Sequence, residues 1–146
     1  MENVRIYEIP KCKMVSSLCG MFGEGKLEKF DEWFSSLPRT MFPKDFLFFD
    51  EEKGGLVWYY MYDEFLQIPE EFEIIDFPGG LYAVATEIDG KDSAGAIDEI
   101  KNFIKNSNCF TEDKSRYYLG NIPTPPAAEK ALGYNQMDYY VPIKIK

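Results

Sequence analysis

The sequence contains no histidine among its 146 residues. Histidine is the usual base for a nucleophile near neutral pH and the commonest metal ligand, so its absence removes both kinds of site in their commonest form. The three cysteines, Cys12, Cys19 and Cys109, are odd in number and form no CxxC pair. They predict neither a disulfide framework nor a zinc site, and we expect no metal and no cofactor.

Long apolar runs and clusters of basic residues are also missing. No stretch reaches the roughly 18–20 apolar residues that cross a bilayer, and the N-terminus has no apolar signal core. We therefore expect a cytoplasmic protein with no membrane partner. The net charge is −9, with no run of Lys or Arg. This balance argues against direct binding of nucleic acid, whose phosphates require a basic face.

Aromatic residues, in contrast, are abundant. They make up 16% of the chain and include ten tyrosines, while apolar residues make up 45%. The length and the apolar share predict one folded domain, residues 1–146. Most aromatic side chains are expected in the core, but tyrosine is amphipathic and also lines pockets that bind flat or cationic ligands.

The chain contains an internal repeat. The segment Val4–Pro10 is echoed by Phe72–Pro78, about 68 residues later, and the elements that follow come in the same order. We place the two repeats at about 1–66 and 70–146. Two copies that cannot bury their sheets alone must pack as one unit, and the boundary between them is a natural place for a ligand groove.

Alternation and helical spacing predict the elements of both repeats. The pattern indicates an α+β fold of two β-hairpin-rich halves, with two main helices on one face of an antiparallel sheet. Asp92 or Ser93 is the predicted N-cap of the second helix, and Gly133 is the predicted end of the third. Strands are expected at 3–9, 14–22, 46–50, 56–62, 72–77, 81–88, 115–119 and 137–144, and helices at 26–36, 94–106 and 127–132.

Strand alternation suggests where a ligand would bind. Asp138 and Tyr140 share one face of the last strand, and Trp58 and Tyr60 occupy the matching face if the repeat offset widens to about 80 residues there. A carboxylate among aromatic rings suits a lipophilic cation. The alternative is that Asp138 is a solvated residue near the chain end and that the rings are ordinary sheet packing.

The closing segment Met137–Ile143 resembles a known family, the GyrI-like small-molecule-binding superfamily. This bacterial superfamily includes the effector-binding domains of multidrug-responsive transcription activators. Its pattern of an acidic residue, an aromatic and a proline at alternate positions is matched by Asp138, Tyr140 and Pro142. The family usually has Glu where this chain has Asp, and the shorter side chain changes how far the acid reaches. The resemblance implies a duplicated β-α-β-β fold with a central aromatic groove.

We therefore expect a binding module for amphipathic, aromatic or cationic small molecules, acting as a sensor or sequestering protein rather than as an enzyme. No helix-turn-helix segment precedes the first strand, so a stand-alone protein is expected. One alternative implied by the resemblance is hydrolysis of strained electrophiles with Asp138 as the base, and another is a gyrase-inhibitor type of protein partner. The predicted ligand-binding residues are Trp58, Tyr60, Tyr117, Asp138 and Tyr140, with Tyr118 in place of Tyr117 if the register differs.

Overall fold

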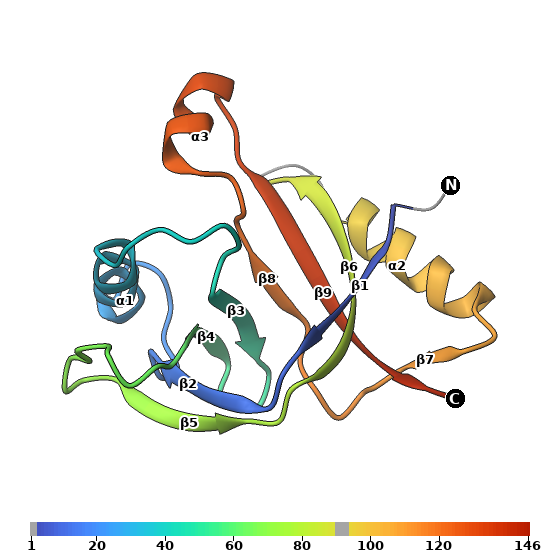
Figure 1. Cartoon of the computed structure of the whole chain (residues 1–146), viewed down its shortest axis with the longest axis horizontal. Coiled ribbons are helices and arrows are strands. Elements are labelled where there is room, and N and C mark those ends of the chain that lie inside the picture. Colours follow the sequence, from blue (N-terminus) through green and yellow to red (C-terminus); the bar gives the residue numbers. More distant parts are fainter. Residues whose placement is uncertain (1–2, 90–93) are drawn as a thin grey trace. The chain divides into compact units, whose positions relative to one another are not determined.

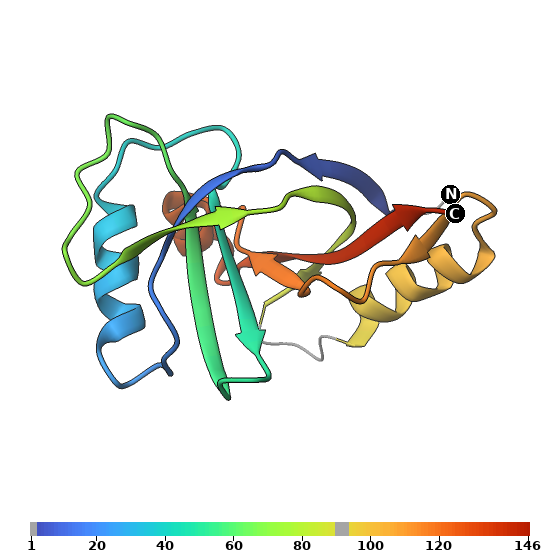
Figure 2. The same ribbon diagram turned by 90° about the horizontal axis from the view of Figure 1, so that it is seen from below.

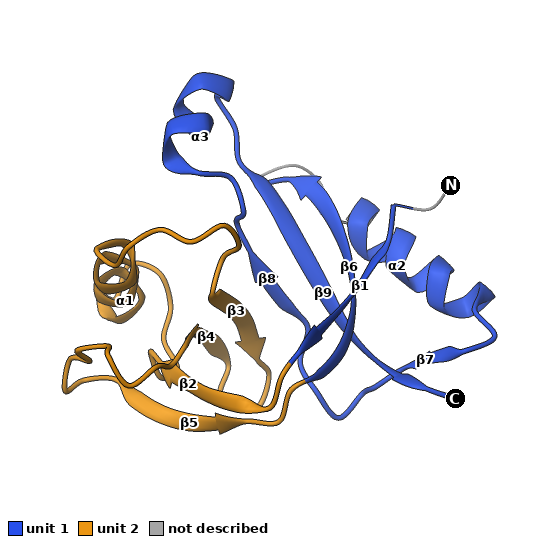
Figure 3. Ribbon diagram, viewed as in Figure 1, with its two compact units in different colours: residues 1–9, 80–146 blue, residues 10–79 orange. Residues whose placement is uncertain are grey.

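The computed structural model describes residues 3–89 and 94–146. The chain forms two compact units, coloured separately in Figure 3. Unit 1 contains residues 1–9 and 80–146, and unit 2 contains residues 10–79. The boundaries of the two units therefore differ from those of the two sequence repeats.

Unit 2 is a four-stranded antiparallel sheet with one helix. Its strands lie in the order β5 (Glu73–Phe77), β2 (Cys12–Ser16), β4 (Gly55–Met61) and β3 (Asp45–Asp50). Helix α1 (Lys26–Ser35) packs against β4 (Figures 1 and 2). The predicted hairpin of β3 and β4 is confirmed, with each strand starting one residue earlier than expected.

Local sequence explains where α1 begins and which side it buries. The Glu28 carboxylate accepts hydrogen bonds from the backbone N–H groups of Gly23 and Gly25, which satisfies donors at the helix start. Leu27 and Phe30 are fully buried. Phe30 belongs to an aromatic cluster between α1 and the sheet. Its other members come from α1, from the sheet, and from the segments that follow α1 and β4: Val15, Trp33, Phe34, Leu37, Trp58, Tyr60, Tyr62, Leu66, Ile68 and Phe72.

Unit 1 repeats this arrangement. Its sheet is antiparallel, and helix α2 (Ala94–Asn106) packs on it (Figure 1). The strand order is β1 (Arg5–Ile9), β6 (Gly80–Ile88), β9 (Gln136–Ile145) and β8 (Leu119–Asn121), with β7 (Phe110–Glu112) paired to the end of β9. A short helix, α3 (Pro126–Leu132), ends at Gly133 in a left-handed conformation, as the sequence predicts.

The core of unit 1 lies between α2 and one face of its sheet. Small residues on β6, Ala83 and Ala85, let the helix approach closely, and Ile100 of α2 is fully buried against them. Val141 and Ile143 of β9 complete this cluster. Because side chains alternate along a strand, Asp138 and Tyr140 lie on the opposite face of the sheet, away from α2.

The two units confirm the predicted α+β fold of duplicated β-α-β-β halves. In each unit a strand is followed by a helix and then by two paired or neighbouring strands of the same sheet: β2, α1, β3 and β4 in unit 2, and β6, α2, β8 and β9 in unit 1. An edge strand, β5 or β1, pairs with the first of these strands, and unit 1 has β7 in addition. The edge strands are exchanged with respect to the repeats. β1 comes from the first repeat but pairs with β6, and β5 comes from the second repeat but pairs with β2.

Some predicted boundaries are wrong for identifiable reasons. The strand expected at 115–119 lies instead at 119–121, because the Asp113 carboxylate accepts hydrogen bonds from the backbone and hydroxyl of Ser115 and forms a turn there. The strand expected at 14–22 ends at Ser16, just before Leu18 takes a left-handed conformation. The short strand β7 was not predicted. The predicted cap residues Asp92 and Ser93 lie outside the described residues.

None of the helices in the described ranges is long and apolar enough to cross a membrane.

Candidate functional site

Asp138 lies in the middle of the sheet of unit 1. It is paired with Thr86 of β6 on one side and with Asn121 of β8 on the other. Only 5% of Asp138 is exposed. The alternative that Asp138 is a solvated residue near the chain end is therefore wrong, because β9 is a central strand and not a frayed terminus.

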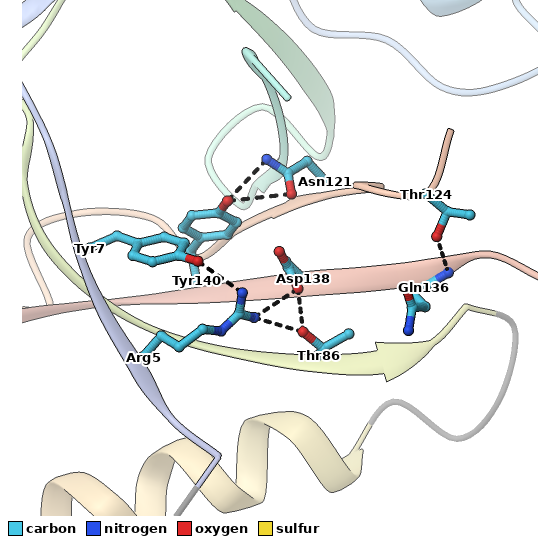
Figure 4. Close-up of polar contacts among 8 residues, drawn as sticks. All are labelled: Arg5, Tyr7, Thr86, Asn121, Thr124, Gln136, Asp138 and Tyr140. Carbon is cyan, nitrogen blue, oxygen red and sulfur yellow. Dashed lines mark hydrogen bonds and ion pairs between the residues drawn. The ribbon is translucent and has the colours of Figure 1, made fainter. Parts of the chain in front are cut away.

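Arg5 forms an ion pair with this buried carboxylate. Its Nη2 donates to Asp138 Oδ1 at 2.9 Å and to Thr86 Oγ1 at 2.6 Å, and its Nη1 donates to Tyr7 Oη at 2.9 Å (Figure 4). Burial acts to lower the pKa of Arg5, but its hydrogen bond to Asp138 and the negative charge there outweigh burial and raise that pKa. Arg5 therefore stays charged and holds Asp138 as a neutralised pair.

The two oxygens of Asp138 are in different environments. Oδ1 accepts hydrogen bonds from Arg5 and from the hydroxyl of Thr86. Among the described residues, no side chain donates to Oδ2, which points away from Arg5 and Thr86 in Figure 4. This oxygen can accept a hydrogen bond from another molecule.

Three tyrosines surround this pair on the same face of the sheet. The ring centroid of Tyr140 lies 6.3 Å from that of Tyr7 and 6.1 Å from that of Tyr82. The Tyr140 hydroxyl accepts a hydrogen bond from Asn121 Nδ2 at 3.1 Å. Burial, together with the charge of Asp138, raises the pKa of Tyr140 to about 12. The hydroxyl therefore remains protonated at neutral pH.

A second arginine stacks on this aromatic group. The Arg116 Cζ lies 4.7 Å from the ring centroid of Tyr82. Its position is fixed by Nη2, which donates to the carbonyl oxygens of Leu81 and Ile143, and by Nε, which donates to Asp113 Oδ2 at 3.0 Å. The face away from α2 thus carries two guanidinium groups, each over a tyrosine.

Tyr117 and Tyr118 are placed differently from Asp138. Tyr118 packs with the α2 cluster, where its hydroxyl donates to Glu112 at 3.0 Å and the ammonium of Lys101 lies 5.9 Å from its ring centroid. This is the other face of the sheet. Tyr117 is 39% exposed. Of the four candidates in unit 1, the structure brings together Asp138 and Tyr140.

The predicted match between Tyr60 and Tyr140 is wrong. Tyr60 faces α1 in unit 2 and contacts Phe34, with the rings 5.8 Å apart, and Trp58 is in the same cluster. Tyr140 faces away from the helix of its own unit. A difference of one residue in the alignment moves a side chain to the other face of a strand, so Tyr59 and not Tyr60 is equivalent to Tyr140.

Trp58 and Tyr60 have their own carboxylate neighbour. Trp58 Nε1 donates to Asp45 Oδ2 at 3.0 Å, and Asp45 is paired with Tyr60 in the sheet. Burial raises the pKa of Asp45, and the hydrogen bond from Trp58 opposes this rise. No sequence pattern singles out Asp45, which directly follows Lys44 at the start of a strand.

Arg5, Tyr7 and Thr86 were not predicted as site residues. Alternation along β1 places Arg5 and Tyr7 on one face, and this signal was present in the sequence. The missing information was the pairing. β1 lies beside β6, which lies beside β9, and this order brings Arg5 to Asp138 across 133 residues of chain.

A hollow of about 340 Å³ lies beside this network, and it shares Thr86 with it. Its other lining residues are Asn3, Glu87, Ile88, Glu99 and Gln136.

In the part of the chain that the structure describes, no group of three His, Cys, Asp or Glu side chains is placed to hold a metal ion.

Comparison of the sequence with known proteins gives no match: no family model matches it, and no curated protein does. Solved structures do match. The C-terminal domain of EcmrR is 13% identical, with a TM-score of 0.61 over 97% of this chain and 96% of that domain. A protein from Listeria innocua described as a hydrolase is 10% identical, with a TM-score of 0.65 over 98% of this chain and 93% of that one.

SAV2435, solved with bound tetraphenylphosphonium, is 11% identical, with a TM-score of 0.56 over 99% of this chain and 94% of that one. At these identities the matches show a shared fold. The chain therefore has the same fold as the C-terminal domain of EcmrR.

Proposed function

We propose that this chain is a binding module for amphipathic, aromatic or cationic small molecules and that it belongs to the GyrI-like superfamily. The observation that supports this most is the face of unit 1 away from α2. There a buried carboxylate, Asp138, lies beside the rings of Tyr7 and Tyr140. Aromatic surfaces with a few fixed polar groups are typical of small-molecule sites.

Two structural neighbours support this proposal. SAV2435 was solved with tetraphenylphosphonium, an aromatic cation, and shares the fold of this chain. The EcmrR C-terminal domain shares it too, and EcmrR has been solved in complex with DNA. The chain matches only 57% of that longer protein. The shared fold and the ligand of SAV2435 support a role in sensing or sequestering a small molecule.

The proposed roles of the residues follow from their contacts. Tyr140 offers a buried ring for stacking and a hydroxyl fixed by Asn121. Asp138 offers Oδ2 as an acceptor, while Arg5 holds its other oxygen. A buried hydrogen bond to a charged group contributes about 1.5–3 kcal/mol, so a donor on the ligand would gain much of its affinity here. Tyr117, Tyr118, Trp58 and Tyr60 stay predictions as ligand contacts.

Binding of amphipathic aromatic probes, measured by isothermal titration calorimetry, tests the proposal. We expect Asp138→Asn and Tyr140→Ala each to weaken binding by about tenfold or more, because each removes one of the central contacts. The matched control is Asp98→Asn, which removes the same group from the exposed side of α2 and should leave binding unchanged. Circular dichroism confirms that each variant is folded.

Equal affinity of the wild type, Asp138→Asn and Tyr140→Ala for every probe would exclude this site.

The second candidate function is hydrolysis, which the match to a protein described as a hydrolase favours. The same experiment separates the two functions, since chromatography of the recovered probe shows whether it is intact. An altered strained electrophile, left intact by Asp138→Asn, would support hydrolysis.

A further inference from the structure

We propose that the Arg5–Asp138 pair makes this a site for uncharged aromatic ligands that carry an N–H or O–H donor, and that the pair discriminates against permanent cations. The inference rests on the proposed function and specifies its ligand class. This ligand class differs from the lipophilic cation that the sequence suggests. That expectation takes Asp138 to be a negative charge without a counter-ion.

The charges of the pair cancel at the site. The guanidinium of Arg5 lies 2.9 Å from Asp138, and their side chains are 39% and 6% exposed. The carboxylate is therefore the buried partner, and its charge is compensated within hydrogen-bond distance. A cation that arrives beside Asp138 meets a dipole rather than a net negative charge, so its electrostatic gain is small.

Arg5 is held by more than its ion pair. Two of its hydrogen bonds go to uncharged groups, the hydroxyls of Tyr7 and Thr86. A cation that replaced Arg5 at Asp138 would have to break these contacts as well. The arrangement therefore favours a ligand that leaves the pair intact.

Two of the tyrosine rings already face a guanidinium group of the protein itself. Arg5 Cζ lies 5.3 Å from the ring centroid of Tyr7, and Arg116 Cζ lies 4.7 Å from that of Tyr82. These are distances at which a cation is attracted to the face of a ring. A cationic ligand at either of these ring faces would meet a guanidinium of like charge.

Polar groups that suit an uncharged ligand remain. Asp138 Oδ2 accepts no hydrogen bond from a side chain in the described ranges and points away from Arg5 (Figure 4). A ligand donor bonded to this oxygen leaves every contact of Arg5 in place. The ring of Tyr140 beside it supplies the aromatic surface.

Two probes, each with phenyl rings on a tetrahedral centre, test the inference. Tetraphenylphosphonium is a permanent cation without a donor, whereas triphenylmethanol is uncharged and carries one O–H group. We expect the wild type to bind triphenylmethanol more tightly. Arg5→Gln removes the compensating charge, so we expect it to bind tetraphenylphosphonium at least tenfold more tightly than the wild type, with an affinity that falls as salt is added.

Lys13→Gln is the matched control. It removes the same charge from the exposed ion pair with Asp76 and therefore changes the net charge equally. We expect no change in either affinity. Arg5→Lys keeps the charge and should keep the wild-type preference, which separates an effect of charge from an effect on folding.

The results distinguish the inference from the function on which it rests. Wild-type preference for tetraphenylphosphonium, unchanged in Arg5→Gln, would overturn the inference and leave the proposed binding function standing. If neither the wild type nor Arg5→Gln bound either probe, both would fail.

Discussion

Tyr140 shows how its surroundings set the behaviour of one side chain. It is 5% exposed, its hydroxyl contacts Asn121, and a carboxylate lies two residues before it on the same face. Burial and that nearby charge both disfavour the phenolate, which is why the pKa rises from 10.0 to about 12.

This shift predicts how stability depends on alkaline pH. The unfolded chain releases the Tyr140 proton near pH 10, whereas the folded chain holds it until about pH 12. The contribution of Tyr140 is therefore complete below pH 10 and is lost as the pH rises through 12. We expect the stability difference between the wild type and Tyr140→Phe to shrink over this range. Urea unfolding at a series of pH values measures it.

Near neutral pH, Tyr140→Phe should cost about 1–3 kcal/mol, because Asn121 is left without this buried partner contact. A constant difference between the two proteins from neutral pH to pH 12 would contradict the assignment of the raised pKa to Tyr140.

At the residue scale the sequence was informative about Asp138 and Tyr140 but not about Arg5. A strand pattern shows which residues share a face, and this placed Asp138 beside Tyr140 correctly. It does not show which strands are neighbours. Arg5 could be linked to Asp138 only through the pairing of β1 with β6 and of β6 with β9.

At the scale of elements, both main helices and the hairpin follow from local signals. The α2 helix occupies the predicted range, Ala94–Asn106, and α1 ends one residue earlier than predicted. The error at β4 has a different cause. The strand was found, but its side chains were assigned to the wrong face. The second repeat has extra residues between β8 and β9, including α3, and they hide a shift of one residue in the alignment.

Trp58→Phe tests the revised face of β4. The substitution removes the indole N–H that donates to Asp45, a partly buried carboxylate, and should destabilise the protein by about 1–3 kcal/mol. Trp33→Phe is the matched control, since its indole donates to the exposed carbonyl of Gln67 and water can replace that bond. Urea unfolding compares the two variants.

An equal cost for Trp58→Phe and Trp33→Phe would contradict the placement of Trp58 against Asp45. The control variant has a second use. The chain has two tryptophans, so Trp33→Phe leaves Trp58 as the single fluorescent tryptophan. Quenching by a bound aromatic probe then tests the prediction from the sequence that Trp58 contacts the ligand.

At the scale of the whole chain, the exchange of edge strands separates sequence repeats from structural units. Repeat 70–146 contains β5 but lacks β1, and repeat 1–66 has the opposite defect. The repeat was detectable because both strands end in an apolar residue and proline. The pairing partner of each strand was not detectable, because β1 and β5 have similar patterns and local sequence does not encode the choice of partner.

The exchange predicts which fragments of unit 1 fold. Ile9 is paired with Gly80 at one end of the antiparallel β1–β6 pair, so a two-residue Asn-Gly turn can join them as a hairpin. We expect residues 1–9 joined in this way to 80–146 to be more structured than residues 70–146. The joined chain covers the edge of β6 and supplies Arg5 to Asp138, whereas the repeat leaves that carboxylate without its counter-ion.

Circular dichroism, urea unfolding and dispersion of amide NMR signals compare the two fragments. Arg5→Gln in the joined fragment separates the two contributions of β1: if strand pairing dominates, the variant stays structured, and if the ion pair dominates, it resembles 70–146. A fragment 70–146 as structured as the joined chain would mean that β1 is dispensable to unit 1. The sequence repeat, rather than the exchanged unit, would then be the element that folds.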